Sequence, residues 1–317
     1  MESNYRKAPS NYNDWVQDRI DNPSIGASMS ASILGFNPYQ SAVDIWEQLV
    51  FKNHEKEDNL AMYLGREMEP IVKKLFMDRT GLKVVADNKI RIDKEFDYLT
   101  TNLDGVVVGE QIPVEYKTTA KPWSGEIPDN YFVQLQHQMM VTNAPSVYFC
   151  SLSMGFQKQL VVEKYDRNDD FIGSMRDELI NFWETNVLKE IPPQIKTLED
   201  AKKIYTDVDK NSILTADDSL QVHVSELRAM QVSKKDLEKR MNDKKIELMK
   251  SIGNFETLVD HLGEVIVSWK KSNPTEVFDK KKFQEENPDI YNKYLINKQG
   301  SRRFIVKPSE VYNKGDK

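Results

Sequence analysis

The chain has 317 residues, 39% of them hydrophobic and 30% charged, which is typical of a globular protein with a substantial core. No apolar run approaches the roughly 20 residues of a membrane span, and the N-terminus has no apolar stretch typical of a secretory signal. Its one cysteine, Cys150, excludes an intramolecular disulfide and a cysteine-rich metal or iron–sulfur site. The net charge of −6 combines acidic residues 1–195 with mildly basic residues 196–317, and we expect a cytoplasmic protein.

The first third of the chain predicts helices. Residues 26–35 predict a loop that enters a short helix, capped by Ser28 or Ser30. Apolar residues at helical spacing predict helices over residues 41–51 and 60–80. Proline disrupts a helix interior, so Pro70 also allows a second interpretation, in which it marks the first turn of the later helix.

The middle of the chain predicts a sheet and further helices. Strands rich in β-branched and aromatic residues are predicted at residues 83–87, 89–93, 98–108, 113–119, 146–154 and 159–165. Helices are predicted over residues 131–141 and 171–188.

Two prolines, Pro192 and Pro193, indicate a domain boundary, giving domains 1–193 and 194–317. The second domain is predicted to hold a linker with a short helix, a long charged helix over residues 220–252, and strands at 265–269 and 303–306.

Three charged residues of the predicted sheet form the central candidate site. Side chains alternate along a strand, so Glu115 and Lys117 point the same way, about 6.5 Å apart along the backbone. A hairpin would return Asp104 beside Glu115. Two carboxylates that meet there suit Mg²⁺, which binds few protein oxygens and keeps several waters. A lysine beside them can orient the attacking water and stabilise charge on a phosphate, so the pattern favours metal-assisted phosphodiester hydrolysis.

A structural interpretation of the same residues stays open. Asp-Gly is a common turn, and Glu-x-Lys is common as a solvated pair on an exposed strand. Glu69, which precedes Pro70, is either a carboxylate that reaches the metal or a surface acid near a helix start.

The helix predicted over residues 131–141 carries a run of amides. Gln134 and Gln138 share one face, with Tyr131 one turn earlier, and such side chains suit the positioning of water or phosphate. The alternative is a polar outer face of a core helix. A cation and a hydroxyl near a helix start, Arg19 and Ser28, form a candidate phosphate site, with an N-cap and a surface arginine as the alternative.

Together, these motifs resemble the YqaJ-type viral recombinase family, which includes the phage lambda exonuclease, within the PD-(D/E)xK nuclease superfamily. The matching segments are, in order, Arg19, IGASMSASILGFNPY, GREMEP, NLDGVVV, VEYKT and QLQHQM. They span roughly residues 15–165. The resemblance implies an α/β fold, with a restriction-endonuclease-like core of a central mixed sheet flanked by helices, and a C-terminal appendage of one long helix with a small β element.

The resemblance also implies roles for individual residues. Glu69, Asp104 and Glu115 are implied to bind Mg²⁺, with Mn²⁺ as an alternative, and Lys117 to be the catalytic lysine. Gln136, with Gln134 and Tyr131 near it, is implied to hold the attacking water or the scissile phosphate. Arg19 and Ser28 match positions that bind the 5′-phosphate of a DNA end, although the spacing between them differs from that of some relatives. The related nucleases with an iron–sulfur cluster are excluded by the single cysteine, so no such cluster is expected.

The implied function is 5′→3′ digestion of double-stranded DNA ends to expose 3′ single strands, with a single-strand annealing protein as partner and a homotrimeric ring as a candidate assembly. Three alternatives remain: an endonuclease or nickase with the same core, a DNA-binding recombination scaffold without catalysis, and a coiled-coil adaptor built on residues 220–252. The basic C-terminal segment, with Lys280–Lys282 and Arg302–Arg303 among aromatic residues, predicts either a DNA contact or a surface that packs against protein.

Overall fold

The computed structural model describes residues 4–52, 60–121, 125–156, 158–208, 212–297, 300 and 302–307. These residues form two compact units, Met1–Ile204 and Tyr205–Lys317. The prediction placed the domain boundary after residue 193. The first unit continues through helix α7 (Leu198–Ile204), because Asp200 accepts a hydrogen bond from the Ser41 hydroxyl at 2.6 Å and Lys203 pairs with Asp44.

The first unit is built around one mixed sheet. Its strand order is β1-β3-β4-β5-β6-β7, and β2 pairs in parallel with β4. Strands β5 and β6 are parallel to each other, and the other pairs along this path are antiparallel. The strands are β1 (Asn4–Lys7), β2 (Ile25–Gly26), β3 (Val84–Ile92), β4 (Leu99–Val107), β5 (Pro113–Thr119), β6 (Ser146–Ser153) and β7 (Leu160–Asp166).

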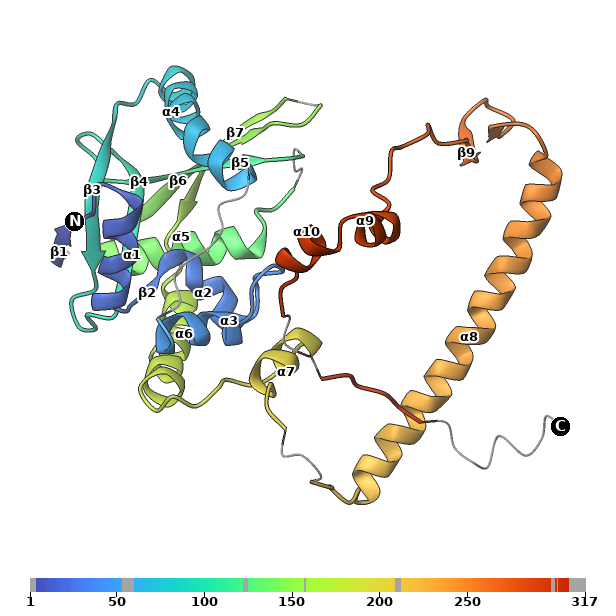
Figure 1. Cartoon of the computed structure of the whole chain (residues 1–317). Helices are drawn as coiled ribbons and strands as arrows, with labels where there is room; N and C mark the ends of the chain where they lie inside the picture. Colours follow the sequence, from blue (N-terminus) through green and yellow to red (C-terminus); the bar gives the residue numbers. More distant parts are fainter. Residues whose placement is uncertain are drawn as a thin grey trace. The chain divides into compact units, whose positions relative to one another are not determined.

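Helices cover both faces of this sheet (Figure 1). They are α1 (Tyr12–Asp21), α2 (Ala27–Leu34), α3 (Ala42–Val50), α4 (Leu60–Thr80), α5 (Asp129–Thr142), α6 (Asp169–Phe182), which runs into the π-helix η1 (Trp183–Val187), and α7. The predicted central mixed sheet flanked by helices is confirmed.

The core has two layers, one on each face of the sheet. The larger cluster joins α2, α3, α5, α6 and η1 to one face, and includes Leu135 and Phe149. The smaller cluster joins α4 to the other face through Val72 and Phe76, and includes Cys150. Adjacent residues of β6 therefore enter different clusters, as the alternation of a strand requires. Burial raises the pKa of the Cys150 thiol to about 12.

Helix α4 begins at Leu60, runs through Pro70 and ends at Thr80, and Gly81, whose φ is +72°, follows it. The interpretation that Pro70 marks the first turn is therefore wrong, and Glu69 lies inside the helix. A proline in a helix interior costs about 3 kcal/mol. Val72 and Phe76, which follow it on the same helix, are both 0% exposed, and burying each contributes about 1.5–3 kcal/mol. Tertiary burial thus offsets the local cost.

Two other local predictions also need correction. The N-cap of α2 is Gly26, and Ser28 and Ser30 both lie within the helix. The predicted strands at residues 83–87 and 89–93 are one strand, β3, with register shifts around Asp87 where Arg91 pairs with it at 2.7 Å.

The second unit is built on one long helix, α8 (Asp218–Ile252). It is followed by a hairpin of β8 (Thr257–Val259) and β9 (Val265–Ser268) and by two short helices, α9 (Lys280–Glu286) and α10 (Pro288–Lys293). The predicted appendage of a long helix with a small β element is confirmed. The predicted strand at residues 303–306 is wrong, since β9 pairs with β8 instead. Across the described ranges, no helix has the length and apolarity needed to cross a membrane.

Candidate active site

Strands β4 and β5 bring Asp104 to Glu115. The register pairs Gly105 with Val114, and one step further along this antiparallel pair Asp104 reaches Glu115. The Asp104 carboxylate accepts a hydrogen bond of 2.9 Å from the backbone N–H of Tyr116. Asp104 and Gly105 lie within β4, so the turn interpretation of this dipeptide is wrong. The predicted meeting of these two strands at the acidic residues is observed.

Gly105 lies where β4 packs closely on β3. A Cβ at this position would lie 2.5 Å from Cγ1 of Val84, closer than two carbon atoms can approach. A larger residue would force Val84 or the strand to shift, so glycine allows the close packing of β4, which carries Asp104, on β3.

Glu115 is a buried carboxylate with three donors. Its side chain is 3% exposed. Lys117 Nζ lies 2.5 Å and Gln134 Nε2 lies 2.7 Å from Oε1, while Gln138 Nε2 lies 2.6 Å from Oε2. Glu115 and Lys117 share one face of β5, as the alternation predicted, so the exposed-strand interpretation of this pair is wrong. Lys117 Nζ also lies 5.7 Å from the ring centroid of Tyr131.

The charges of the site act strongly on one another. Burial raises the pKa of Asp104 well above its usual value, and the nearby Glu115 raises it further. Burial and then Glu115 also raise the pKa of Glu69. Burial alone would lower the pKa of Lys117, but Glu115 and Asp104 outweigh it and raise this pKa. Three carboxylates therefore interact with two ammonium groups, since Lys73 also acts on Glu69. The excess negative charge favours a bound cation.

The residue types fit a Mg²⁺ site. Within the described part of the chain, no three His, Cys, Asp or Glu side chains form a ready-made cluster for a metal. Mg²⁺ commonly binds one or two carboxylates and keeps several waters, so a three-residue cage is not needed. Half-buried Asp104 and buried Glu115 supply hard oxygen donors. A divalent cation would relieve the repulsion between these two carboxylates, which raises the pKa of Asp104. Glu69 interacts with them from α4.

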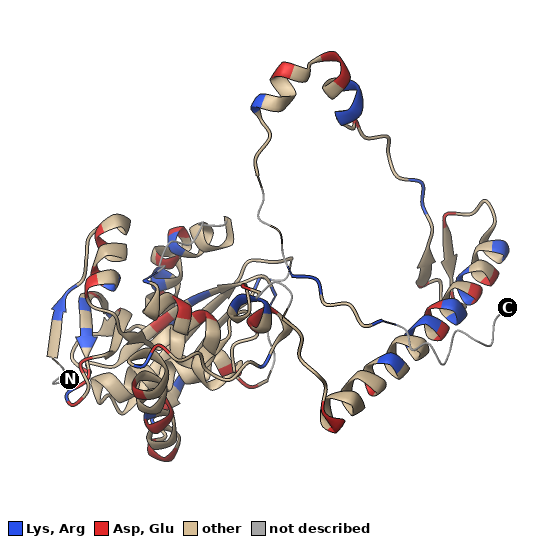
Figure 2. Cartoon of the chain, turned by 60° about the horizontal axis from the view of Figure 1, so that its bottom comes forward, with Lys and Arg blue, Asp and Glu red and all other residues tan. Residues whose placement is uncertain are grey.

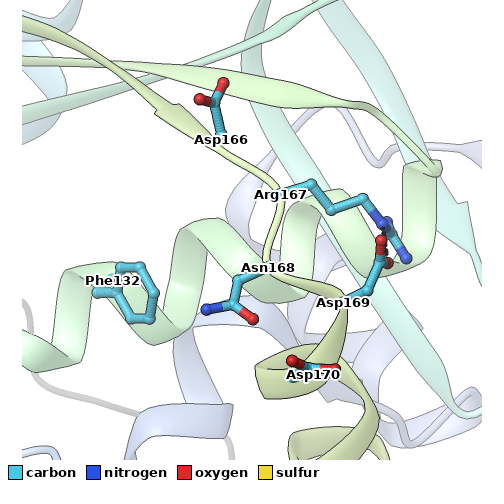
Figure 3. A pocket seen from close by; sticks show the side chains of 6 residues that line it. All are labelled: Phe132, Asp166, Arg167, Asn168, Asp169 and Asp170. Atoms are coloured by element: carbon cyan, nitrogen blue, oxygen red, sulfur yellow. Dashed lines mark hydrogen bonds and ion pairs between the residues drawn. The ribbon is translucent and has the colours of Figure 1, made fainter.

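Gln136 is not part of this site, and its predicted role is corrected. Its amide nitrogen donates to the carbonyl of Asp166 at 3.1 Å, and its amide oxygen accepts from the N–H of Asn168 at 2.9 Å. Gln136 therefore holds the segment between β7 and α6, which Figure 3 shows beside Phe132 of α5. On a helix, positions two apart point to different sides, so Gln136 cannot share the face of Gln134 and Gln138.

The site contains Gln138, to which the resemblance assigned no role. The signal was present in the sequence, because Gln134 and Gln138 are four residues apart and were predicted to share a face with Tyr131.

A cavity of about 410 Å³ beside α6, lined by Phe132 and Asp166–Asp170, does not include the carboxylates of the site.

A second cavity brings Arg19 and Ser28 together. It has a volume of about 1000 Å³, and its lining also includes Trp15, Gln48 and Arg66. The Arg19 guanidinium lies 3.8 Å from the ring centroid of Trp15. Among the described residues Arg19 makes no ion pair, and its neighbour Asp18 is paired with Arg6 at 3.0 Å.

This arginine is a half-buried cation that an anion would stabilise. Burial lowers the pKa of Arg19 to about 10, partly offset by Asp18, so the group stays charged at neutral pH. A charge removed from water is costly unless it is paired. Arg66 lies three residues before Glu69 on α4, a rise of about 4.5 Å along the helix. The cavity and Glu69 are therefore neighbours along one helix.

His137 and Cys150 play no part in this geometry. Both ring nitrogens of His137 form hydrogen bonds inside the core, one with the Ser30 hydroxyl at 2.6 Å and one with the Thr100 carbonyl at 3.0 Å. Burial lowers the pKa of His137 to about 4, so this side chain is neutral and structural.

Part of the chain is similar to a recombinase family. Residues 14–145 match the model of the YqaJ-like viral recombinase domain, a range that includes Arg19, Glu69, Asp104, Glu115 and Gln138. This match confirms the resemblance that the sequence motifs indicated.

Particular relatives extend the comparison. The chain is 26% identical over 309 residues to the uncharacterized protein YqaJ of Bacillus subtilis (strain 168), covering 93% of each chain. Among solved structures, it is similar to the alkaline exonuclease LHK-Exo of Laribacter hongkongensis, with a TM-score of 0.47, 22% identity, and coverage of 57% of this chain and 94% of that one. A phage-related exonuclease from Haemophilus somnus 129PT has a TM-score of 0.42 and 13% identity, covering 55% and 99%.

Proposed function

We propose that the chain is a Mg²⁺-dependent DNA nuclease, with Mn²⁺ as a possible substitute, that digests double-stranded DNA from its ends. The observation that carries the proposal is the pairing of half-buried Asp104 with buried Glu115, with Lys117 bonded to Glu115 at 2.5 Å. The match of residues 14–145 to the YqaJ-like viral recombinase domain supports it. Two of the similar solved structures are named exonucleases.

In this proposal Asp104 and Glu115 hold the metal, and Glu69 assists from α4. A bound Mg²⁺ supplies Lewis-acid chemistry, in that it polarises the phosphate and lowers the pKa of a water. Lys117, an ammonium group in this setting, donates to the phosphate oxygens and stabilises the charge that develops there. Gln134, bonded to the same oxygen of Glu115 as Lys117, helps to keep the carboxylate and the lysine together.

The cavity at Arg19 is the proposed site for the end of the substrate. A 5′-terminal phosphate would pair with the Arg19 guanidinium, and the Ser28 hydroxyl can donate to the same group. Arg66 lines the same cavity. An enzyme that holds a 5′-phosphate beside its carboxylates removes nucleotides from the 5′ end, so the product is a 3′ single strand.

The wider setting follows the family. We infer a single-strand annealing protein as partner for the product, a homotrimeric ring as the assembly, and the bacterial cytoplasm as the location if a phage encodes the chain. The basic segment with Lys280–Lys282 is a candidate for added DNA contact.

The test compares linear 5′-phosphorylated duplex with covalently closed circular duplex, in Mg²⁺ and in EDTA. We expect only the linear DNA to be digested. EDTA should abolish the digestion, and Lys117→Ala should lower its rate by roughly 10²–10³-fold. The matched control is Lys202→Ala, since Lys202 is an exposed lysine of the same unit that pairs only with exposed Glu199 among its described neighbours.

The other outcomes separate the alternatives. Cutting of closed circles would favour an endonuclease or nickase with the same core. If neither substrate is cut but linear DNA is still bound, the scaffold alternative replaces the enzyme.

A further inference from the structure

The two oxygens of the Glu115 carboxylate are held in different ways. Oε1 accepts from two donors, Lys117 Nζ at 2.5 Å and Gln134 Nε2 at 2.7 Å. Among the described residues Oε2 accepts from one donor, Gln138 Nε2 at 2.6 Å. The terminal torsion of a glutamate rotates broadly when nothing holds it. A hydrogen-bond donor on each oxygen restricts that rotation, and Gln138 supplies the donor to Oε2.

Packing alone does not account for an amide at this position. Gln138 is 0% exposed, and its amide oxygen is buried without a hydrogen-bond partner in the described part of the chain. A buried acceptor without a partner costs free energy, whereas methionine would fill a similar volume with no such cost. Among the described residues, the Gln138 side chain makes one hydrogen bond, and that bond is to Glu115. The sequence therefore keeps a polar group in the core in order to contact this carboxylate.

The backbone of α5 presents Gln138 firmly to the strand. The residue lies in the interior of the helix, and its carbonyl accepts a hydrogen bond of 2.7 Å from the Thr142 hydroxyl. One turn earlier, Gln134 reaches the other oxygen of Glu115 from the same helix face.

We propose that Gln138 is a positioning residue for Glu115: by holding Oε2 it sets the orientation in which the carboxylate meets a divalent cation. The inference rests on the proposed function, because it needs Glu115 to be a metal ligand. Partners that orient a metal ligand typically change metal affinity by about 10–100-fold when they are removed.

The chain offers a matched control on the same helix. Gln136 is also 0% exposed and also makes side-chain hydrogen bonds, but to the backbone of Asp166 and Asn168. Gln136→Met and Gln138→Met therefore remove the same chemical group from equally buried positions, and only the second removes a contact with Glu115.

The experiment measures Mn²⁺ binding to the full chain without DNA, by electron paramagnetic resonance of the free ion. We expect Gln138→Met to weaken Mn²⁺ binding by about 10-fold or more. Gln136→Met should bind Mn²⁺ as the wild type does, with a lower melting temperature. Mn²⁺ affinity of Gln138→Met equal to that of the wild type, in a folded protein, would overturn the proposal, as would an equal loss in both variants.

A second variant covers a failure to fold. Gln138→Asn keeps the amide but is one methylene shorter, so it cannot span the same distance to Oε2, and we expect weaker Mn²⁺ binding there too. Wild-type affinity in this variant would count against the proposal.

The failure of the proposed function has a different signature. A wild-type chain that neither binds Mn²⁺ nor digests linear DNA would remove both ideas. A wild-type chain that does both, with Gln138 variants that behave identically to it, would remove only the role of Gln138.

Discussion

The first unit buries its side chains and the second unit exposes them. Within the described residues, Ile252 is the single hydrophobic side chain of the second unit that is buried, whereas the first unit contains two core clusters. Along α8, acidic and basic side chains are interspersed and give no face of one sign (Figure 2). A buried setting is needed to hold carboxylates at raised pKa and short distance, so the chemistry belongs to the first unit. The second unit offers an accessible surface instead.

The largest expected difference between the units is in stability. Phe149 is 0% exposed between the rings of Tyr131 and Tyr165, and Phe149→Ala should lower the free energy of unfolding by about 3–5 kcal/mol. Phe304 is 88% exposed, and Phe304→Ala should change it by less than about 0.5 kcal/mol. Chemical denaturation measures the free energy of unfolding of both variants. Similar decreases in the two variants would contradict the expected difference in burial between the units.

Removal of one carboxylate should affect activity next most strongly. Asp104→Asn keeps an acceptor for the Tyr116 N–H but removes a charged oxygen ligand. We expect digestion of linear duplex to fall at least about 100-fold, since even residues that only orient a ligand cost about 10–100-fold. Initial rates at saturating Mg²⁺ are the measurement. An Asp104→Asn enzyme with the wild-type rate would exclude Asp104 from the metal site.

The same substitution should stabilise the metal-free protein. The folded state raises the pKa of Asp104, so this group favours the folded state at low pH, and that contribution is lost as pH rises above the usual value of 3.8. In EDTA at pH 8, Asp104→Asn should therefore melt a few degrees above the wild type, since about 1 kcal/mol shifts the midpoint by roughly 2–4 °C. At pH 4 the difference should shrink. A variant that is less stable at pH 8 would contradict the expected charge repulsion.

The smallest effect is expected from deletion of residues 205–317. Because the first unit contains both core clusters, its melting temperature should change by less than about 4 °C. Digestion of a short linear duplex by the truncated chain should persist, and any loss that appears only above physiological salt would locate DNA contacts in the second unit. A truncated chain that fails to fold would show that the units depend on each other.

Local rules predicted the strands and the charged residues of the site. Alternation along β5 placed Glu115 and Lys117 on one face, and the hairpin brought Asp104 to them. These are short-range consequences of backbone geometry, so they can be derived from the sequence.

Long-range packing decided what the local rules could not. The spacing of Gln134 and Gln138 showed that they share a face, but it did not show that Gln136 bonds to the backbone before α6. The path of α4 through Pro70 likewise depends on the burial of Val72 and Phe76.

The position of Cys150 has a practical consequence. The attacking species in thiol chemistry is the thiolate, and a buried thiol with a pKa of about 12 hardly forms it at neutral pH. Maleimide dyes should therefore not label Cys150 in the folded protein. A cysteine introduced at exposed Met230 of α8 would be the one position to react, so a single fluorophore could follow the C-terminal helix in solution without any prior removal of native cysteines.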